Sequence, residues 1–244
     1  TVDDVSSNSN LGVLTGTTFT DGKVGGARSF NGTSDYINAG SGISLANQSF
    51  TLEAWAKRET TGAINMILGQ GSASTNNGLQ FGFRDTNTFA CAFYGNDLIT
   101  SDIYIDNSWH HWACTFDSTT KVRKIYRDGI EVASDIATAN YQGSGSLIIG
   151  ARYLTSPSYF NGMLDEIHVS DTVRSGDEIK RSYLNGVSNY IGEYISDVLD
   201  FGSSSYIEQF TWSGNGVHTG DGETPYSTTG LIAQWDLNES SGTT

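Results

Sequence analysis

Two aspartates at the starts of strand-like segments could hold a metal ion. Asp165 alternates with Ile167 and Val169, so its carboxylate should point toward the core, and Asp35 stands in the same relation to Ile37. A carboxylate in the core needs a partner, which is either a calcium ion or backbone amides that donate hydrogen bonds. Both explanations stay open at this point. Asp35 and Asp165 are therefore candidate calcium ligands or turn caps.

Three aromatic side chains could form a platform for a sugar ring. Trp55 lies on the Glu53 and Lys57 side of its strand segment, opposite the apolar residues. An aromatic ring on a polar face of a sheet can stack on a sugar. The alternative is that another layer or loop covers the ring. Tyr94 and Tyr153 complete this candidate glycan platform.

The chain lacks the residue patterns expected of an enzyme. A glycosidase needs two facing carboxylates about 5–9 Å apart, whereas the neighbours Asp165 and Glu166 should point to opposite faces of a strand. There is no Gly-x-Ser-x-Gly motif and no glycine-rich phosphate-binding loop. The histidine pair 110–111 has no metal-ligand spacing to the distant His168 and His218. We expect no catalytic residues and no enzyme activity.

The composition favours an extracellular all-β protein with many tight turns. Gly is plentiful (29 residues of 244), Pro is scarce (2), and only 16% of residues are charged, so Ser, Thr, Asn and Gly must build most of the surface. The net charge of −14 opposes nucleic-acid binding and suits calcium. No apolar run approaches the roughly 20 residues that span a bilayer, so no membrane span is expected.

The two cysteines lie in strand-like segments and should face the core. Cys91 shares a face with Phe89 and Phe93, and Cys114 shares one with Trp112. A cross-strand disulfide and two reduced core thiols are equally compatible with this pattern.

Short strand candidates recur about every 10 residues, which is the spacing of a β-sandwich. The dipeptide Asp128-Gly129 predicts a two-residue type I′ hairpin turn. One helix is predicted over residues 176–185, because Ser175 and Glu178 form a capping box and Gly186 suits the C′ position. The predicted strands are Ala27–Phe30, Tyr36–Ala39, Phe50–Ala56, Ile64–Gly69, Leu79–Arg84, Phe89–Tyr94, Leu98–Ile105, Trp109–Asp117, Val122–Arg127, Ile130–Ser134, Ser146–Ala151 and Met163–Ser170.

The last residues of the chain look like the start of a β domain. Residues 231–237 form a β-type stretch, and the polar residues after them predict a turn that residues 1–12 would continue. The stretch needs a groove to bury its apolar face, because an unpaired apolar strand is prone to aggregate. The residues on that face are Leu231, Ala233, Trp235 and Leu237.

Joined tail to head, residues 230–244 and 1–12 resemble the opening of a laminin-G-like, concanavalin-A-type jelly-roll domain, W-x-[FL]-x-E-x-S-G-T-x-x-x-D-x-S-G-N-x-N. The rest of the family pattern follows in order in residues 24–37, 49–57, 109–117, 125–129, 147–150 and 160–169. The resemblance predicts an all-β, two-sheet antiparallel jelly-roll sandwich with one short helix near residues 176–185 and a small C-terminal β appendage.

The resemblance also implies a domain organisation and a cofactor. Residues 1–186 would be a jelly roll without its first strand, residues 187–229 a β spacer or linker, and residues 230–244 the displaced first strand. Such jelly rolls often bind one structural Ca²⁺ near the segments of Asp35 and Asp165. The family's Phe-Asp-Gly is Phe-Asn-Gly at residues 30–32 here, which removes one charge from that site.

Two functions compete. The displaced strand favours a non-enzymatic extracellular structural subunit, in which residues 231–237 fill the groove of the next copy and join copies head to tail into a fibre or surface array. The spacer 187–229, with strand candidates Tyr194–Phe201 and Tyr206–Trp212, favours the next copy over the chain's own domain. The alternative is a carbohydrate-binding module or adhesin domain, stabilised by calcium, whose partners are glycans.

Overall fold

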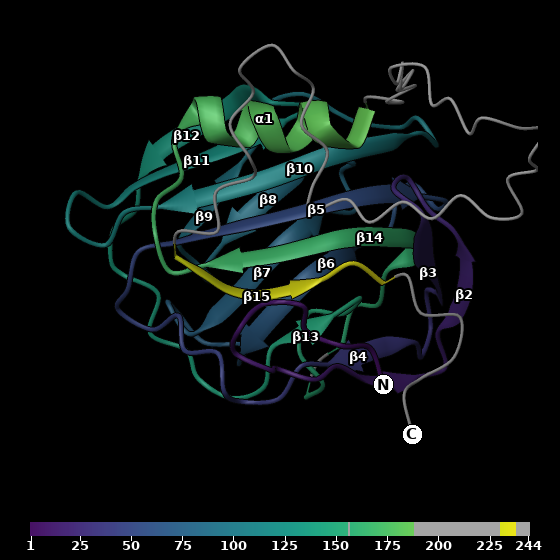
Figure 1. Ribbon diagram of the computed structural model, residues 1–244. Helices are drawn as coiled ribbons and strands as arrows, with labels where there is room; N and C mark the ends of the chain where they lie inside the picture. The colour runs from purple at the N-terminus through teal and green to yellow at the C-terminus, as the bar shows by residue number, and fades with distance from the viewer. Residues whose placement is uncertain (156, 188–229, 238–244) are drawn as a thin grey trace, which may run out of the picture.

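The computed structural model describes residues 1–155, 157–187 and 230–237. Within them, two antiparallel sheets pack face to face, and a helix lies on the outer face of one sheet (Figure 1). This arrangement confirms the predicted jelly-roll sandwich. The strand candidates Tyr194–Phe201 and Tyr206–Trp212 lie outside the described residues.

The first sheet has seven strands in the described residues, in the order β1-β4-β13-β6-β7-β8-β9. Their bounds are β1 Val13–Thr15, β4 Tyr36–Asn38, β13 Ile148–Ile149, β6 Asn65–Gly71, β7 Gly78–Phe83, β8 Phe89–Ala92 and β9 Asp97–Ile99. The predicted strand Leu98–Ile105 is shorter than expected, because Thr100 Oγ1 donates to the Asp102 carbonyl and turns the chain away.

The second sheet has eight strands in the described part of the chain, in the order β12-β11-β10-β5-β14-β3-β2 with β15 added beside β14. Their bounds are β12 Ile130–Ile136, β11 Val122–Arg127, β10 Trp109–Phe116, β5 Phe50–Arg58, β14 Asn161–Ser170, β3 Gly26–Asn31, β2 Thr18–Asp21 and β15 Leu231–Trp235. The positive φ angles of Asp128 (52°) and Gly129 (76°) fit the predicted type I′ turn between β11 and β12.

The core lies between the two sheets and follows the predicted alternation except at Asp165. A β-bulge between Asp165 and His168 puts Asp165 opposite Trp55 on the outer face, so its predicted inward direction is wrong. Phe89 of β8 and Trp112 of β10 stack with ring centroids 3.9 Å apart and an interplanar angle of 4°. Cys91 and Cys114 form a disulfide that joins the two sheets. Of the two alternatives for the cysteines, the bonded one is therefore present.

Strand β15 completes the second sheet within its own chain. It pairs with β14 in antiparallel register, Ile167 opposite Trp235 and Val169 opposite Ala233. Ala233, Trp235 and Leu237 are fully buried in the core, as the alternation predicted, whereas Leu231 is only partly buried. The expected insertion into a neighbouring copy is therefore corrected to insertion into the same domain.

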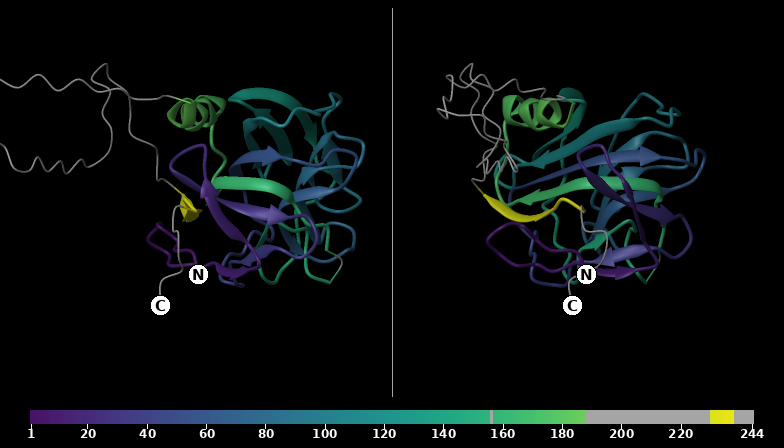
Figure 2. Two further views of the ribbon diagram at one scale, coloured as in Figure 1. Left: turned by 90° about the vertical axis from the view of Figure 1, so that its right-hand side faces the viewer. Right: turned by 45° about the vertical axis from the view of Figure 1, so that its right-hand side comes forward.

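The N-terminal segment explains this placement, because it covers the other side of β15 (Figure 2). The Val5 amide donates to the Gln234 carbonyl at 3.0 Å, and the Gln234 amide donates to Asp4 Oδ1 at 3.0 Å. Trp235 Nε1 donates to the Asn10 carbonyl at 2.9 Å. Both edges of β15 thus have partners in the same chain.

Helix α1, Gly176–Val187, begins where the sequence predicted and extends past the expected end at residue 185. The Ser175 amide donates to Glu178 Oε2 at 2.8 Å and the Glu178 amide to Ser175 Oγ at 3.3 Å, which is the predicted capping box. Gly186 is not a C′ residue but lies in the last turn of the helix. A Cβ there would come within 2.4 Å of Trp55 Nε1, so glycine allows the helix to pack on that ring.

Candidate functional site

The outer face of the second sheet is covered by α1, and this decides the role of Trp55. The indole ring is 3% exposed and stacks on Tyr183 of the helix, with centroids 5.7 Å apart. The alternative explanation, a covering layer, is therefore the correct one. Trp55 is removed from the candidate glycan platform because the helix covers its ring.

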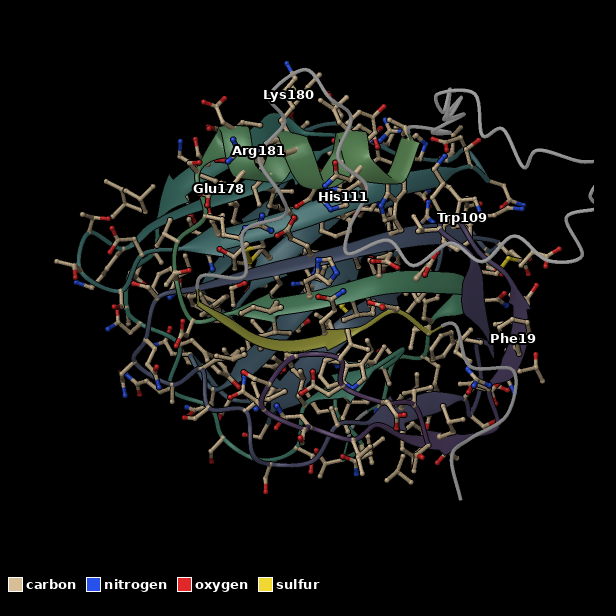
Figure 3. All side chains as sticks on the ribbon, in the orientation of Figure 1. Phe19, Trp109, His111, Glu178, Lys180 and Arg181 are labelled. Carbon is tan, nitrogen blue, oxygen red and sulfur yellow. A yellow bond between two sulfur atoms is a disulfide. The ribbon has the colours of Figure 1, made fainter. Side chains whose placement is uncertain are left out.

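Beneath the helix lies a set of buried polar side chains. Glu53 accepts a hydrogen bond from Arg174 Nη1, and its Oε2 lies 3.4 Å from His111 Nε2. Burial opposes ionisation of Glu53, but the His111 hydrogen bond and the Arg174 charge hold the pKa of this carboxyl below its usual value. Arg174 also donates to Ser182 Oγ of α1 at 3.1 Å, so this arginine links the helix to Glu53 of β5. Figure 3 shows His111 below the helix.

Asp165 and Asp35 both act as caps of turns. Asp165 is fully buried, and its Oδ2 accepts the amides of Lys23 and Val24 at 2.8 Å each. Burial raises the pKa of Asp165 to about 7. Asp35 Oδ2 accepts the Asn31 amide at 3.0 Å.

The structure does not bring the two aspartates together. Asp165 caps the turn before β3, and Asp35 caps the turn after it. Six residues of extended β3 separate the two turns, a span of roughly 20 Å at about 3.3 Å per residue. One ion cannot bind both carboxylates at that distance. Calcium binding by either residue alone stays a prediction.

Tyr94 and Tyr153 come together on the outer face of the first sheet. A Cβ added to Gly78 would lie 3.1 Å from Tyr94 Cβ and 3.3 Å from Tyr153 Cε1, so the two tyrosines flank this glycine. Tyr94 is 37% exposed, whereas Tyr153 is 3% exposed and forms the floor of the patch. The Tyr153 hydroxyl has no hydrogen-bond partner among the described residues.

Charged side chains surround the two tyrosines. Arg84 Nη2 donates to Asp97 Oδ2 at 3.1 Å, and Arg84 Nη1 donates to Gln80 Oε1 at 3.0 Å. The Arg152 guanidinium lies 4.9 Å from the centroid of the Tyr153 ring. Burial raises the pKa of the Tyr153 hydroxyl, which also feels the charges of Arg152, Arg84 and Asp97. We call Tyr94, Tyr153, Arg84, Asp97 and Arg152 the tyrosine patch.

The sequence identified the two tyrosines but missed their charged neighbours. Arg84 comes at the end of the β7 segment and Asp97 at the start of β9, and no motif connects them. A period-2 pattern does predict that Gln80 faces away from the core, because Leu79 and Phe81 face into it. The only sequence signal for the patch is therefore the alternation that puts residues on the outer face of the sheet; no motif with fixed spacing marks it.

Comparison with protein families identifies the fold family. Residues 31–180 match the model of Laminin_G_3, the concanavalin A-like lectin/glucanases superfamily. The chain belongs to the Laminin_G_3 family. No curated protein matches this Laminin_G_3 chain. Among the described residues, no helix is long and apolar enough to cross a membrane.

Solved structures with the same fold include binding domains. Domain 4 of AbnA, a GH43 extracellular arabinanase from Geobacillus stearothermophilus, was solved in complex with arabinotriose. It matches this Laminin_G_3 chain with a TM-score of 0.57 and 19% identity, over 70% of this chain and 86% of that one. The binding domain of Paraclostridial Mosquitocidal Protein 1 matches with a TM-score of 0.59 and 19% identity, over 75% of this chain and 49% of that one. At these identities the likeness shows the fold alone.

Proposed function

We propose that this Laminin_G_3 domain is a non-catalytic carbohydrate-binding module and that the tyrosine patch is its binding surface. The observation that supports the proposal is the combination of one exposed and one buried tyrosine with neighbouring arginine and aspartate side chains. Aromatic rings stack on the C–H faces of sugars, while charged and amide groups hydrogen-bond to hydroxyls.

The roles within the patch follow from exposure. Tyr94 presents a ring to solvent, and it is held in a left-handed conformation (φ 56°) by a hydrogen bond from the Asn76 amide to its carbonyl at 3.1 Å. Tyr153 is almost fully buried, hydroxyl included, so it supports the patch from below rather than contacting the sugar. Arg84 and Asp97, which pair with each other at 3.1 Å, supply a hydrogen-bond donor and an acceptor beside the two tyrosines.

An extracellular setting agrees with this proposal. The disulfide between Cys91 and Cys114 joins the two sheets and persists where the environment is oxidising. The polymer hypothesis, in contrast, rested on a groove that another copy must fill. Strand β15 of the same chain occupies that groove, so a head-to-tail fibre is not proposed here.

Glycan-array screening followed by calorimetric titration tests the proposal. Arabino-oligosaccharides are the first probe, because a domain of the same fold was solved with arabinotriose. We expect Tyr94→Ala to weaken binding about tenfold or more, as expected when an aromatic anchor is removed. The matched control is Phe19→Ala, an aromatic residue of similar exposure (40%) on β2 of the other sheet (Figure 3).

Two results would count against the patch. If Tyr94→Ala binds as tightly as the parent chain with the same melting temperature, the sugar binds elsewhere. If no glycan on a broad array binds the parent chain, the proposed function itself is wrong.

A further inference from the structure

A histidine and two carboxylates from separate segments converge on the outer face of the second sheet. The ligand atoms of Glu166, His168 and Asp236 all lie within 4.8 Å of one another. His168 Nε2 is 3.5 Å from Glu166 Oε2. His168 is buried, and both carboxylates are partly buried.

The sheet register explains why these residues meet. Strand β14 has a β-bulge between Asp165 and His168, and Glu166 within it has a positive φ of 48°. The bulge interrupts the alternation and brings the Glu166 carboxylate to the side of His168. Strand β15 runs antiparallel beside them, with Gln234 opposite His168 and Trp235 opposite Ile167. Asp236 is the next residue and therefore comes beside Glu166. The sequence could not show this, because Asp236 is far from His168 along the chain and only β15 pairing joins them.

Glu166 and Asp236 place two carboxylates next to each other across a strand pair, which is unfavourable without a compensating cation. Arg174 is engaged by Glu53, and the Lys23 ammonium lies 5.2 Å from the centre of the Trp55 ring. A bound divalent ion would offset the repulsion, and His168 would add a nitrogen ligand.

The geometry points to a site for a divalent transition-metal ion, held by Glu166, His168 and Asp236. Atoms bound to one tetrahedral Zn²⁺ at 2.0–2.2 Å lie roughly 3.3–3.6 Å apart, and the His168–Glu166 distance of 3.5 Å falls in that range. An imidazole in the ligand set favours zinc, copper or nickel over calcium and magnesium.

The surroundings suit such a site. A pocket of about 220 Å³ opens beside Glu166 and His168, under the end of α1, and leaves room for a water molecule or an outer ligand at the fourth position. Glu53 is the cross-strand neighbour of His168 on β5, where a carboxylate can orient a metal-binding imidazole. A metal here would also fasten the end of β15 to β14.

Calorimetric titration of the chelator-treated, tag-free chain with ZnCl₂ tests the site, together with melting curves in Zn²⁺ and in CaCl₂. We expect one Zn²⁺ per chain and a rise in melting temperature with Zn²⁺, because the ion binds only the folded form. His168→Gln and Asp236→Asn should each weaken Zn²⁺ binding at least tenfold. Asp236 is only partly buried, so this second variant should fold even if the first does not.

The matched control is His110→Gln. His110 also lies between two carboxylates, Asp128 at 2.6 Å and Asp106 at 2.8 Å, but both ring nitrogens are already hydrogen-bonded. Zn²⁺ binding should be unchanged in this variant. Co²⁺ in place of Zn²⁺ should give a visible absorption band that Asp236→Asn removes.

Three outcomes would overturn the proposal. They are no saturable Zn²⁺ binding, binding that Asp236→Asn leaves unchanged, or binding that His110→Gln removes instead. A preference for Ca²⁺ at the same residues would also exclude the transition-metal assignment. None of these results bears on the tyrosine patch, which lies on the other sheet.

Discussion

Trp112 and Trp235 are both fully buried, yet they hold the sandwich together in different ways. Trp112 lies in the middle of an aromatic cluster, stacked on Phe89 and met edge-on by Phe83 and Tyr104. Its strand, β10, pairs on both sides with β5 and β11, and the disulfide joins it to the other sheet. The region around Trp112 therefore cannot open without breaking the core.

Trp235 lies at the seam where the two described ends of the chain meet. Its strand is five residues long and pairs with β14 on one side only, while residues of the N-terminal segment contact the other side. Its indole Nε1 donates to the Asn10 carbonyl, whereas Trp112 Nε1 has no partner among the described residues. The two tryptophans are equally buried, but the strand of Trp235 has fewer backbone and covalent links to the rest of the fold than the strand of Trp112. We therefore expect the region around Trp235 to unfold locally before the core does.

The largest expected effect is at Trp112. Trp112→Ala should lower the free energy of unfolding by about 3–5 kcal/mol, because it leaves a large cavity in the core. The pairing of β10 with β5 and β11 and the disulfide keep the surrounding chain from closing over that cavity. Denaturant unfolding measures this loss. The control is Trp109→Ala on the same strand, whose side chain is partly exposed (Figure 3) and should cost far less. Equal losses in the two variants would show that the aromatic cluster is not the centre of stability.

Trp235→Ala should cost less, roughly 2–3 kcal/mol, because the seam can separate from a core that stays folded. Hydrogen exchange should show faster exchange at the Val5 and Gln234 amides, while the amides of β10 keep their protection. Uniformly faster exchange across β10 would mean that the seam and the core unfold as one unit, and the contrast between the two tryptophans would fail.

The smallest effect concerns Asp4, which fastens the seam with its carboxylate. Burial opposes its ionisation, but the hydrogen bonds from Gln234, Ser6 and Asn10 hold its pKa below 3.8. A pKa lowered by folding stabilises the protein above the unfolded value, and this contribution is lost as the pH falls through the folded pKa.

We therefore expect Asp4→Asn to cost about 1 kcal/mol at pH 7 and progressively less as the pH approaches 3. Melting curves of the parent chain and the variant over that range measure the difference. Asp85→Asn, at an exposed position, is the control and should show no such pH-dependent difference. A pH-independent difference for Asp4→Asn would show that its hydrogen bonds do not depend on the charge.

Local patterns predicted most of the fold correctly. Alternation along each strand placed Cys91, Cys114, Trp112 and Trp235 on the inner faces, because successive side chains of an extended chain point to opposite sides wherever the strand is. The capping box at Ser175 likewise depends only on residues three apart. These features needed no knowledge of distant contacts.

Only the tertiary structure decided which groups meet across the sheets. Alternation put Trp55 on an outer face, but it could not show that α1 covers that face, and so Trp55 is buried while Tyr94 is exposed. It gave Asp35 and Asp165 the same inward direction, but the β-bulge after Asp165 sets this residue opposite Trp55 on the outer face. It also could not show that β3 separates the two aspartates. The cluster of Glu166, His168 and Asp236 exists because β15 pairs with β14, and strand pairing is set by the groove that a segment fills rather than by its own residues.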